Sequence, residues 1–510
     1  MNAHSPRGAE AKLPPLTAGP HTKRLGLISI VACFGGLLFG YDTGVTNGAE
    51  RPMSHELGLT DLEVGVVVSA LVFAAAVGAM LCGRIADRIG RRPTIIILSV
   101  LFFVGTMTVI FSPANPASLQ VIDAAKGTEA WVGEFSPLGY GILVTGRILL
   151  GLAVGGASAV VPVYLAELAP FEIRGTIAGR NEWAIVFGQL AAFVVNAIIA
   201  ASPLGHNAGV WRFMFAVCAI PAICLFIGML RMPESPRWLV EQGRHGDALK
   251  VLSTIRSKDR AQAELADVEH LAAEEKSETQ LGFKAVLSNK NLLKILVIAS
   301  VLGIAQQFTG VNAIMYYGQR MLAEAGFPED LIGWVNVLPG IMAVVGGTIA
   351  LSMMERINRR TNFLWGLGLT AGSHIAIAIA MLTIPVPPEG SGDLTRGWVF
   401  VALVMIMILS IQTFLNIAVW VYLSEIFPLH MRGIGMGVSV FVLWVANGVL
   451  GLFVPSIVGA IGMGLFAVFA VLNIGSFGFV WKFVPETRGR TLEALEEDVT
   501  TGAIYTVSKK

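Results

Sequence analysis

The chain has 510 residues, of which 54% are hydrophobic and only 14% are charged. An ordinary soluble domain carries roughly 25% charged residues, so this composition excludes a soluble protein and indicates one embedded in a lipid bilayer. The net charge of +1 supports no binding to nucleic acid, and the four cysteines lie in apolar segments without the spacing of metal ligands.

Twelve apolar segments follow a polar start, and each is at least as long as the roughly 20 residues that a helix needs to cross a bilayer. They predict an all-α membrane protein with twelve transmembrane helices in two six-helix bundles. The first segment is too long for the apolar region of a signal peptide. The segments lie near 25–47, 62–82, 93–112, 138–164, 176–201, 211–232, 291–322, 331–353, 362–385, 397–423, 434–457 and 461–484.

The segment at 234–290 differs in kind, because it is rich in Ala, Glu, Lys and Arg and places Leu249, Leu252 and Ile255 at helical spacing. It predicts short amphipathic helices that link the bundles, with a partly ordered linker as the alternative. The predicted domains are a tail at 1–24, a bundle at 25–233, the linker at 234–290, a second bundle at 291–484 and a tail at 485–510.

Loops rich in basic residues alternate along the chain with loops that carry few, and the basic loops mark the cytoplasmic side. Both termini and the linker are therefore expected in the cytoplasm, with the protein in the cell membrane. The opposite loops carry few basic residues, and the longest of these loops, at 113–137, is expected to be solvated. The basic residues on the cytoplasmic side include Lys23, Arg24, Arg84, Arg88, Arg91, Arg92, Arg174, Arg180, Arg356, Arg359, Arg360 and Arg432.

Several motifs occur twice, about half the chain length apart. AELAPFEIRG at 166–175 returns as SEIFPLHMRG at 424–433, and DRIGRR at 87–92 returns as ERINRR at 355–360. PESPRWL and PETRGRTL form a third pair. The chain therefore reads as two homologous halves, an arrangement in which many secondary transporters build a site between the halves.

Charged residues of both signs recur in these motifs at the cytoplasmic ends of the helices. We expect them to interlock as a gate that breaks when this face opens, although isolated surface pairs contribute only about 0–1 kcal/mol and some could merely fix topology. The predicted gate residues are Asp87, Arg88, Arg91, Arg92, Glu167, Arg174, Glu234, Arg237, Glu355, Arg356, Arg359, Arg360, Glu425, Arg432, Glu486 and Arg488.

Asp42 and Arg147 lie inside the first and fourth apolar segments. A charge inside a bilayer is costly and indicates a functional site by default, so we expect the two to be partners. Arginine keeps its charge, which leaves the aspartate as the member that can bind and release a proton. The pair predicts proton coupling, and a permanent bridge between two helices is the alternative.

Polar side chains gather in the seventh segment, in QQFTGVNAIMYY at 306–317. Amides both donate and accept hydrogen bonds, which suits a hydroxyl-rich ligand, although polar residues also hold transmembrane helices together. The predicted substrate-binding residues are Glu182, Gln189, Gln306, Gln307, Asn312, Tyr316, Trp420 and Asn447, with Asn181 adding polar surface.

FGYDTGV, GRIADRIGRR, GRILLG, PESPRWL, QQFTGVNAIMYY and VPETRGRTLEALEE together resemble the sugar porter family of the major facilitator superfamily over about 25–497. The resemblance implies alternating access around a central sugar or polyol site that includes Gln189, Gln306, Gln307, Asn312 and Trp420. It also implies that Asp42 marks a proton symporter and Arg147 its partner. In style the chain is most similar to bacterial myo-inositol transporters, and Glu182 stands where many sugar symporters have Gln.

One departure from the family concerns LNIAV before Trp420, where relatives commonly carry a Gly-Pro or Ser-Pro break. With Asn416 and Ile417 there, we expect a straighter tenth helix.

The sequence thus predicts a monomeric symporter that imports myo-inositol or monosaccharides with a proton and needs no other cofactor. A facilitative uniporter, a drug exporter and a sugar receptor remain alternatives. An enzyme is not expected, because no nucleophile–base set, metal cluster or phosphate loop is present.

Overall fold

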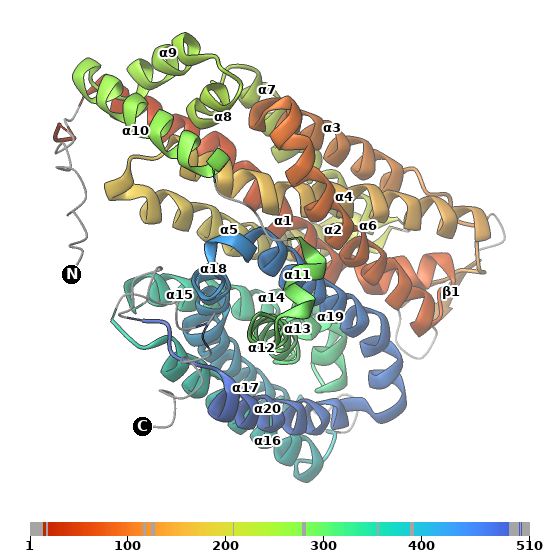
Figure 1. Cartoon of the computed structure of the whole chain (residues 1–510). Helices are drawn as coiled ribbons and strands as arrows, with labels where there is room; N and C mark the ends of the chain where they lie inside the picture. The colour runs from red at the N-terminus through yellow and green to blue at the C-terminus, as the bar shows by residue number, and fades with distance from the viewer. Residues whose placement is uncertain are drawn as a thin grey trace.

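The structure, a computed structural model, describes residues 14–16, 19–115, 119–123, 128–207, 209–277, 282–353, 356–387, 392–488, 499 and 501. Two helical bundles lie side by side, the first built from the red to yellow helices of Figure 1 and the second from the green to blue ones. The fold class is therefore confirmed as a twelve-helix membrane protein with a helical linker.

The first bundle supplies six spans, and a short two-stranded hairpin lies in one of its loops. Its elements are α1 (Pro20–Leu57), α2 (Asp61–Ile89), α3 (Arg91–Ile110), β1 (Leu119–Asp123), β2 (Thr128–Val132), α4 (Pro137–Leu168), η1 (Phe171–Ile173), α5 (Arg174–Ala201), η2 (Pro203–His206), α6 (Val210–Ala216) and α7 (Ala219–Leu230). The last two form the sixth span.

The linker and the second bundle follow, and several spans of this bundle consist of two helical pieces. The linker elements are α8 (Pro236–Glu241), α9 (His245–Ile255), α10 (Lys258–Ser277) and α11 (Phe283–Ser288). The second bundle contains α12 (Lys290–Gln307), α13 (Val311–Glu324), α14 (Glu329–Val335), α15 (Val337–Met353), α16 (Arg359–Thr383), α17 (Thr395–Ile411), η3 (Gln412–Asn416), α18 (Ile417–Ile426), η4 (Leu429–Met431), α19 (Arg432–Ile461), η5 (Gly462–Gly464) and α20 (Leu465–Phe483).

The described residues contain eleven apolar helical stretches long enough to cross a membrane. The last stretch, Arg432–Phe483, joins α19 and α20 through the short turn η5 and so contributes two spans. Gly462 makes this turn possible, because its φ of 54° lies in a region that residues with a side chain rarely adopt.

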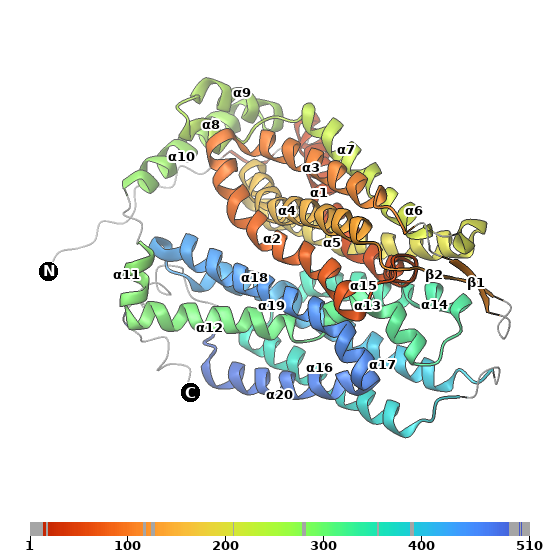
Figure 2. The same ribbon diagram turned by 90° about the vertical axis from the view of Figure 1, so that its right-hand side faces the viewer.

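Different elements outside the spans lie at the two ends of the molecule. Figure 2 shows α8 to α11 at one end, here called the linker face, and β1 with β2 at the other, here called the hairpin face. The hairpin lies in the loop at 113–137, which is the loop expected to be solvated. Its β1 and β2 pair antiparallel, and the amide of Gly133 donates to the carbonyl of His55 at 2.8 Å, which ties the hairpin to α1.

The linker helices form because one face of each is apolar, as the spacing in the sequence predicts. Leu252 and Ile255 of α9 are buried, together with Ala248. The linker is attached to the first bundle by Arg260, whose Nη2 lies 2.9 Å from a carboxylate oxygen of Glu172. Partial burial acts to raise the pKa of Glu172, but hydrogen bonds from its own backbone and from Arg260 outweigh it and lower the pKa below its usual value.

That the tenth span is straighter than in relatives stays a prediction, but this span does depart from a regular α-helix. Residues Gln412–Asn416 form a π-helical turn between α17 and α18. A π-helical turn inserts a wider loop of backbone into an α-helix and is frequent at functional sites. The hydrogen-bonding pattern of the tenth span therefore changes just before Trp420.

Small residues let the two bundles approach closely toward the hairpin face. A Cβ at Gly65 of α2 would collide with the carbonyl of Leu452 in α19, and a Cβ at Gly448 would collide with Phe73. Close backbone contact of this kind is how helices associate where lipid gives no hydrophobic drive. Replacing either glycine would therefore push the bundles apart at this end.

Candidate functional site

Asp42 and Arg147 meet inside the first bundle, as the sequence analysis expected of them. Nη1 of Arg147 donates to both carboxylate oxygens of Asp42, at 3.1 and 3.3 Å. The side chains are 1% and 2% exposed. Each charge is therefore compensated by the other in a site closed to solvent.

The surroundings of Arg147 fix its guanidinium in place. Its Nε donates to the carbonyl of Val67 in α2 at 3.2 Å, and the guanidinium lies 5.7 Å from the ring centre of Phe215 in α6. The arginine thus has partners other than Asp42. If Asp42 moved away, Arg147 would keep its contacts with this carbonyl and this ring.

A break in the seventh span positions the predicted amides. Gly310 separates α12 from α13 with a φ of 77°, and the carbonyl groups freed there are bonded by other side chains. Asn473 donates to the carbonyl of Phe308 at 3.0 Å, and His374 lies 2.8 Å from the carbonyl of Thr309. The last residues of α12 and the first of α13 can therefore face the same space.

Five amide side chains form one continuous chain of hydrogen bonds around this break. Asn312 donates to Gln307 at 2.7 Å, and Gln307 donates to Gln306 at 2.8 Å. Gln306 donates to Asn416 at 2.9 Å, and Asn416 donates to Gln412 at 2.8 Å. These amides satisfy one another, and a ligand with several hydroxyls can replace the bonds one by one.

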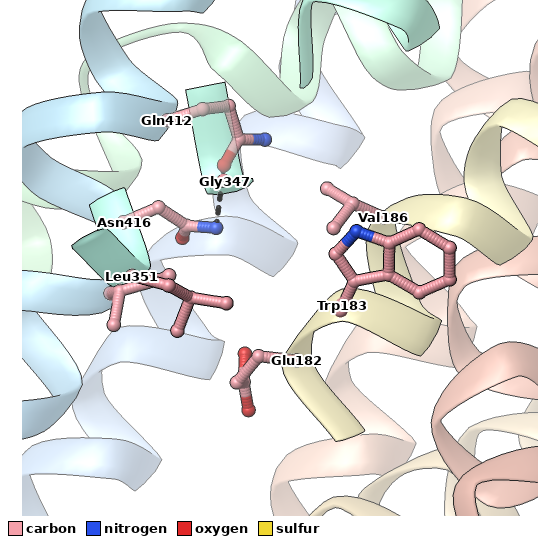
Figure 3. Close-up of a pocket in the computed structure, with 8 residues that line it drawn as sticks. Glu182, Trp183, Val186, Gly347, Leu351, Gln412 and Asn416 are labelled. Atoms are coloured by element: carbon pink, nitrogen blue, oxygen red, sulfur yellow. Dashed lines mark hydrogen bonds between the residues drawn. The ribbon is translucent and has the colours of Figure 1, made fainter. Parts of the chain in front are cut away.

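The end of this amide chain lines a pocket between the two bundles. Figure 3 shows Gln412 and Asn416 of the π-helical turn on one side, facing Glu182 and Trp183 of α5 across the space. The wall also contains Val186, Gly347, Leu351 and Ile417. One carboxylate and two amides thus converge from different bundles on one site.

The remaining predicted binding residues lie apart from this chain of bonds. Asn447 of α19 donates to the hydroxyl of Tyr316 in α13 at 3.2 Å, and both side chains are buried. Gln189 is buried in α5 with 7% exposure. Trp420 is half-buried in α18. The structure therefore brings Gln306, Gln307 and Asn312 together directly.

At the linker face, charged residues of the first bundle cluster around Arg91. Its Nε lies 3.1 Å from Glu167 of α4, and one of its terminal nitrogens lies 3.1 Å from Asp87. Glu234 accepts hydrogen bonds from the backbone amides of Arg91 and Arg92, at 3.0 and 3.2 Å. The glutamate thus caps the first turn of α3, a favourable position for an anion.

The second bundle repeats this arrangement. Arg359 lies 3.1 Å from Glu425, and the carboxylate of Glu486 accepts from the backbone amides of Arg359 and Arg360, at 2.9 and 3.0 Å. Arg488 donates to the carbonyl of Arg356 at 2.7 Å. The sequence repeat therefore corresponds to a repeat of structure, and each cluster described here lies within one bundle.

The other predicted gate residues take different positions. Arg88 is exposed, and Arg237 pairs with Glu241 at 3.4 Å within α8. Arg432 is half-buried at the start of α19. Arg174 begins α5, but its side chain and the whole of Glu355 lie outside the described residues.

At the hairpin face, side chains connect the two bundles across their interface. Nδ2 of Asn47 in α1 donates to the carbonyls of Ile314 and Met315 in α13, at 2.9 and 3.0 Å, and its Oδ1 accepts from the amide of Gln319 at 3.0 Å. Asn47 is 1% exposed. One amide thus serves three backbone groups next to Tyr317, whose φ of −127° interrupts the helix.

We expect Asn47→Ala to lower the thermal stability of the protein in detergent. Three backbone groups of α13 would lose a partner, and each buried group left unsatisfied costs about 1–3 kcal/mol. Thr46→Ala is the matched control, because the hydroxyl of Thr46 bonds only the carbonyl of Asp42 in its own helix. Equal melting temperatures for the two variants would contradict the role given to Asn47.

Within the described part of the chain, no group of three or more His, Cys, Asp or Glu side chains is placed to hold a metal ion. The chemistry available at the site is therefore that of amides, hydroxyls, one carboxylate in the pocket and the buried pair of Asp42 and Arg147.

Sequence reasoning missed several residues of the site. Gln412 was not singled out, and Asn416 was noted only as a departure from relatives, although both are amides four residues apart in an apolar span. Trp183 and Asn47 were also not singled out. Polar residues at helical spacing were a usable signal for Gln412 and Asn416, whereas nothing local in the sequence indicates the partners of Asn47.

Comparison with known proteins gives consistent matches over nearly the whole chain. The profile of the family described as "Sugar (and other) transporter" matches residues 28–499. The major myo-inositol transporter IolT of Bacillus subtilis (strain 168) is 41% identical over 479 residues, which cover 93% of this chain and 94% of that protein.

Solved structures match as well. The xylose transporter XylE from E. coli, in a partially occluded inward-open conformation, is similar with a TM-score of 0.75 and 27% identity, covering 92% of this chain and all of that one. A second structure, of XylE bound to 6-bromo-6-deoxy-D-glucose, is described as that of a proton:xylose symporter. It matches with a TM-score of 0.71 and 28% identity, and the match covers 94% of this chain and 99% of that one.

Proposed function

Because this chain belongs to the sugar transporter family of the major facilitator superfamily, we propose that it imports myo-inositol, and monosaccharides of similar size, together with protons. The observation that carries the substrate proposal is the chain of five amides from Asn312 to Gln412 beside the pocket between the bundles. A cyclic polyol offers hydroxyls on every side, and such a ligand is bound by groups that can both donate and accept.

Proton coupling is supported by Asp42 and Arg147. A buried charge pair in a span is expensive to keep unless it has a function, and the aspartate is its titratable member. The 41% identity to a myo-inositol transporter supports the substrate, and the likeness to a proton:xylose symporter supports the coupling. The coupling ion is then the proton, and no other cofactor is required.

We place the linker face in the cytoplasm, because the loops at this face carry most of the basic residues. In that orientation the carrier is closed toward the outside. Asn47 and several ion pairs join the bundles at the hairpin face, while the charge clusters at the linker face each lie within one bundle. The two XylE structures that match with a TM-score of 0.75 are both described as inward-open, which supports this assignment.

A transport cycle follows from these positions. In the state open to the outside, Asp42 takes up a proton and loosens its contact with Arg147, and the substrate replaces bonds among Gln306, Gln307 and Asn312. The bundles then rock to the state described here, from which substrate and proton leave. Coupling requires that the loaded, protonated carrier favours this change, since a ligand shifts an equilibrium only by its differential affinity.

The experiment that tests this function is uptake of labelled myo-inositol into proteoliposomes, with and without an inward proton gradient. We expect accumulation above equilibrium that depends on the gradient. Equilibration that ignores the gradient would identify a facilitator, and Asp42 would then have a structural role. Entry of glucose or xylose without myo-inositol would contradict the substrate and leave the family intact.

A further inference from the structure

A cluster of three charged side chains crosses the interface of the bundles at the hairpin face. Arg320 comes from α13, Glu50 from α1 and Asp61 from the first residue of α2. Nη1 of Arg320 lies 3.5 Å from Oε1 of Glu50, and Nη2 donates to Oδ1 of Asp61. One guanidinium of the second bundle therefore faces two carboxylates of the first.

Burial differs among the three side chains, and the most deeply buried is the carboxylate of Glu50. Glu50 is 3% exposed, Arg320 22% and Asp61 39%. The second carboxylate oxygen of Glu50 has no hydrogen-bond partner among the residues that the structure describes. A buried carboxylate needs a compensating charge, and its sequence neighbour Arg51 is bonded to Glu329 at 2.6 and 2.9 Å. Arg320 is therefore the charge that faces Glu50 at contact distance.

Asp61 also packs against α19 of the second bundle. Gly459 of α19 lies so close to Asp61 that a Cβ there would collide with the carboxylate. Asp61 therefore lies between a side chain and the backbone of the second bundle. It can keep these contacts only while α2 is packed against α13 and α19.

From this geometry we propose that Arg320 is a positioning residue, a latch that holds the bundles together at the hairpin face through Glu50 and Asp61. If the bundles separate there, Arg320 leaves both carboxylates at once and water solvates all three groups. An interaction that exists in only one of two states shifts the equilibrium toward that state. The proposal goes beyond the transport function, because it concerns the resting state of the empty carrier whatever its substrate.

The test measures the distance between spin labels at two exposed positions of the hairpin face, Glu134 in the first bundle and Thr395 in the second, in the empty protein. The labels are placed in a background in which Cys33, Cys82, Cys218 and Cys224 are replaced by alanine. For Arg320→Gln we expect a second, longer distance, with the ratio of open to closed molecules raised about tenfold or more, because Glu50 would be left buried and unpaired in the closed state.

Two matched variants separate a latch from a general disturbance. Arg320→Lys keeps the charge and is expected to restore much of the closed population. Arg51→Gln removes the other ion pair that joins the bundles, but Glu329 is 77% exposed, so the distances should stay as in the parent protein. If Arg320→Gln does not yield folded protein, Asp61→Asn at its half-exposed site is expected to shift the distances in the same direction by a smaller amount.

The proposal is overturned if Arg320→Gln, or Asp61→Asn in its place, leaves the distances of the parent protein unchanged. It is also overturned if Arg51→Gln opens the hairpin face as much as Arg320→Gln does. Because the measurement needs neither substrate nor proton gradient, its outcome is separate from that of the uptake experiment.

Discussion

Asp42→Asn is expected to abolish accumulation of myo-inositol driven by a proton gradient while leaving exchange of labelled for unlabelled substrate across the membrane. Asparagine can still accept a hydrogen bond from Arg147, so the contact between α1 and α4 can persist. Unlike aspartate, asparagine has no carboxyl group that could bind and release a proton. Uptake should therefore stop at equilibrium, and imposed changes of external pH should no longer alter the final level.

Glu56→Gln is the matched control for this substitution. Glu56 is another carboxylate of the first bundle held by an arginine in a buried site, with Nη1 of Arg212 at 2.8 and 2.7 Å from its two oxygens. Its side chain is 8% exposed. It lies at the hairpin end of α1, so its neutralisation should leave gradient-driven accumulation in place. Accumulation that survives Asp42→Asn would refute the coupling role of Asp42.

Gln307→Ala is expected to weaken substrate binding by about 5-fold to 30-fold, since one or two hydrogen bonds of roughly 1 kcal/mol each would be lost. Gln307 is the centre of the amide chain, where it accepts from Asn312 and donates to Gln306. Its removal also releases the orientation of both neighbours. The measurement is the Kd for myo-inositol of the purified protein.

Asn473→Ala provides the comparison, because Asn473 is an amide near the same break in the seventh span that bonds only backbone carbonyls, those of Phe308 and Phe469. Its loss should lower thermal stability more than affinity. If Gln307→Ala binds myo-inositol as tightly as the parent protein, the amide chain is structural and the substrate binds elsewhere.

Much of the architecture could be predicted from the sequence, because a bilayer imposes local requirements. A span needs a long apolar segment whatever its neighbours are, so the twelve spans were visible without any knowledge of packing. The linker helices were visible for a similar reason, since Leu252 and Ile255 lie at helical spacing in a segment rich in charged residues. The repeat of short motifs indicated two bundles, and matching clusters around Arg91 and Arg359 lie where the repeated motifs fall.

The candidate site could be predicted only in part. The isolation of Asp42 and Arg147 in apolar segments was enough to suggest that they meet, and they lie 3.1 Å apart. The amides of the seventh span were predicted to bind substrate because several of them lie close together in one apolar segment. Their roles in transport remain predictions.

What only the tertiary structure decided are the contacts between segments far apart in the chain. Glu167 faces Arg91 rather than a residue of its own motif, because α3 and α4 pack side by side. Asn416 in the π-helical turn meets Gln306 of α12, more than a hundred residues away in the chain. Arg320 meets Glu50 and Asp61 only when the bundles close at the hairpin face. By itself the sequence determined which segments enter the bilayer, since that depends on the local balance of apolar and charged residues. The pairing of polar groups depended on the packing of whole helices, which no local pattern encodes.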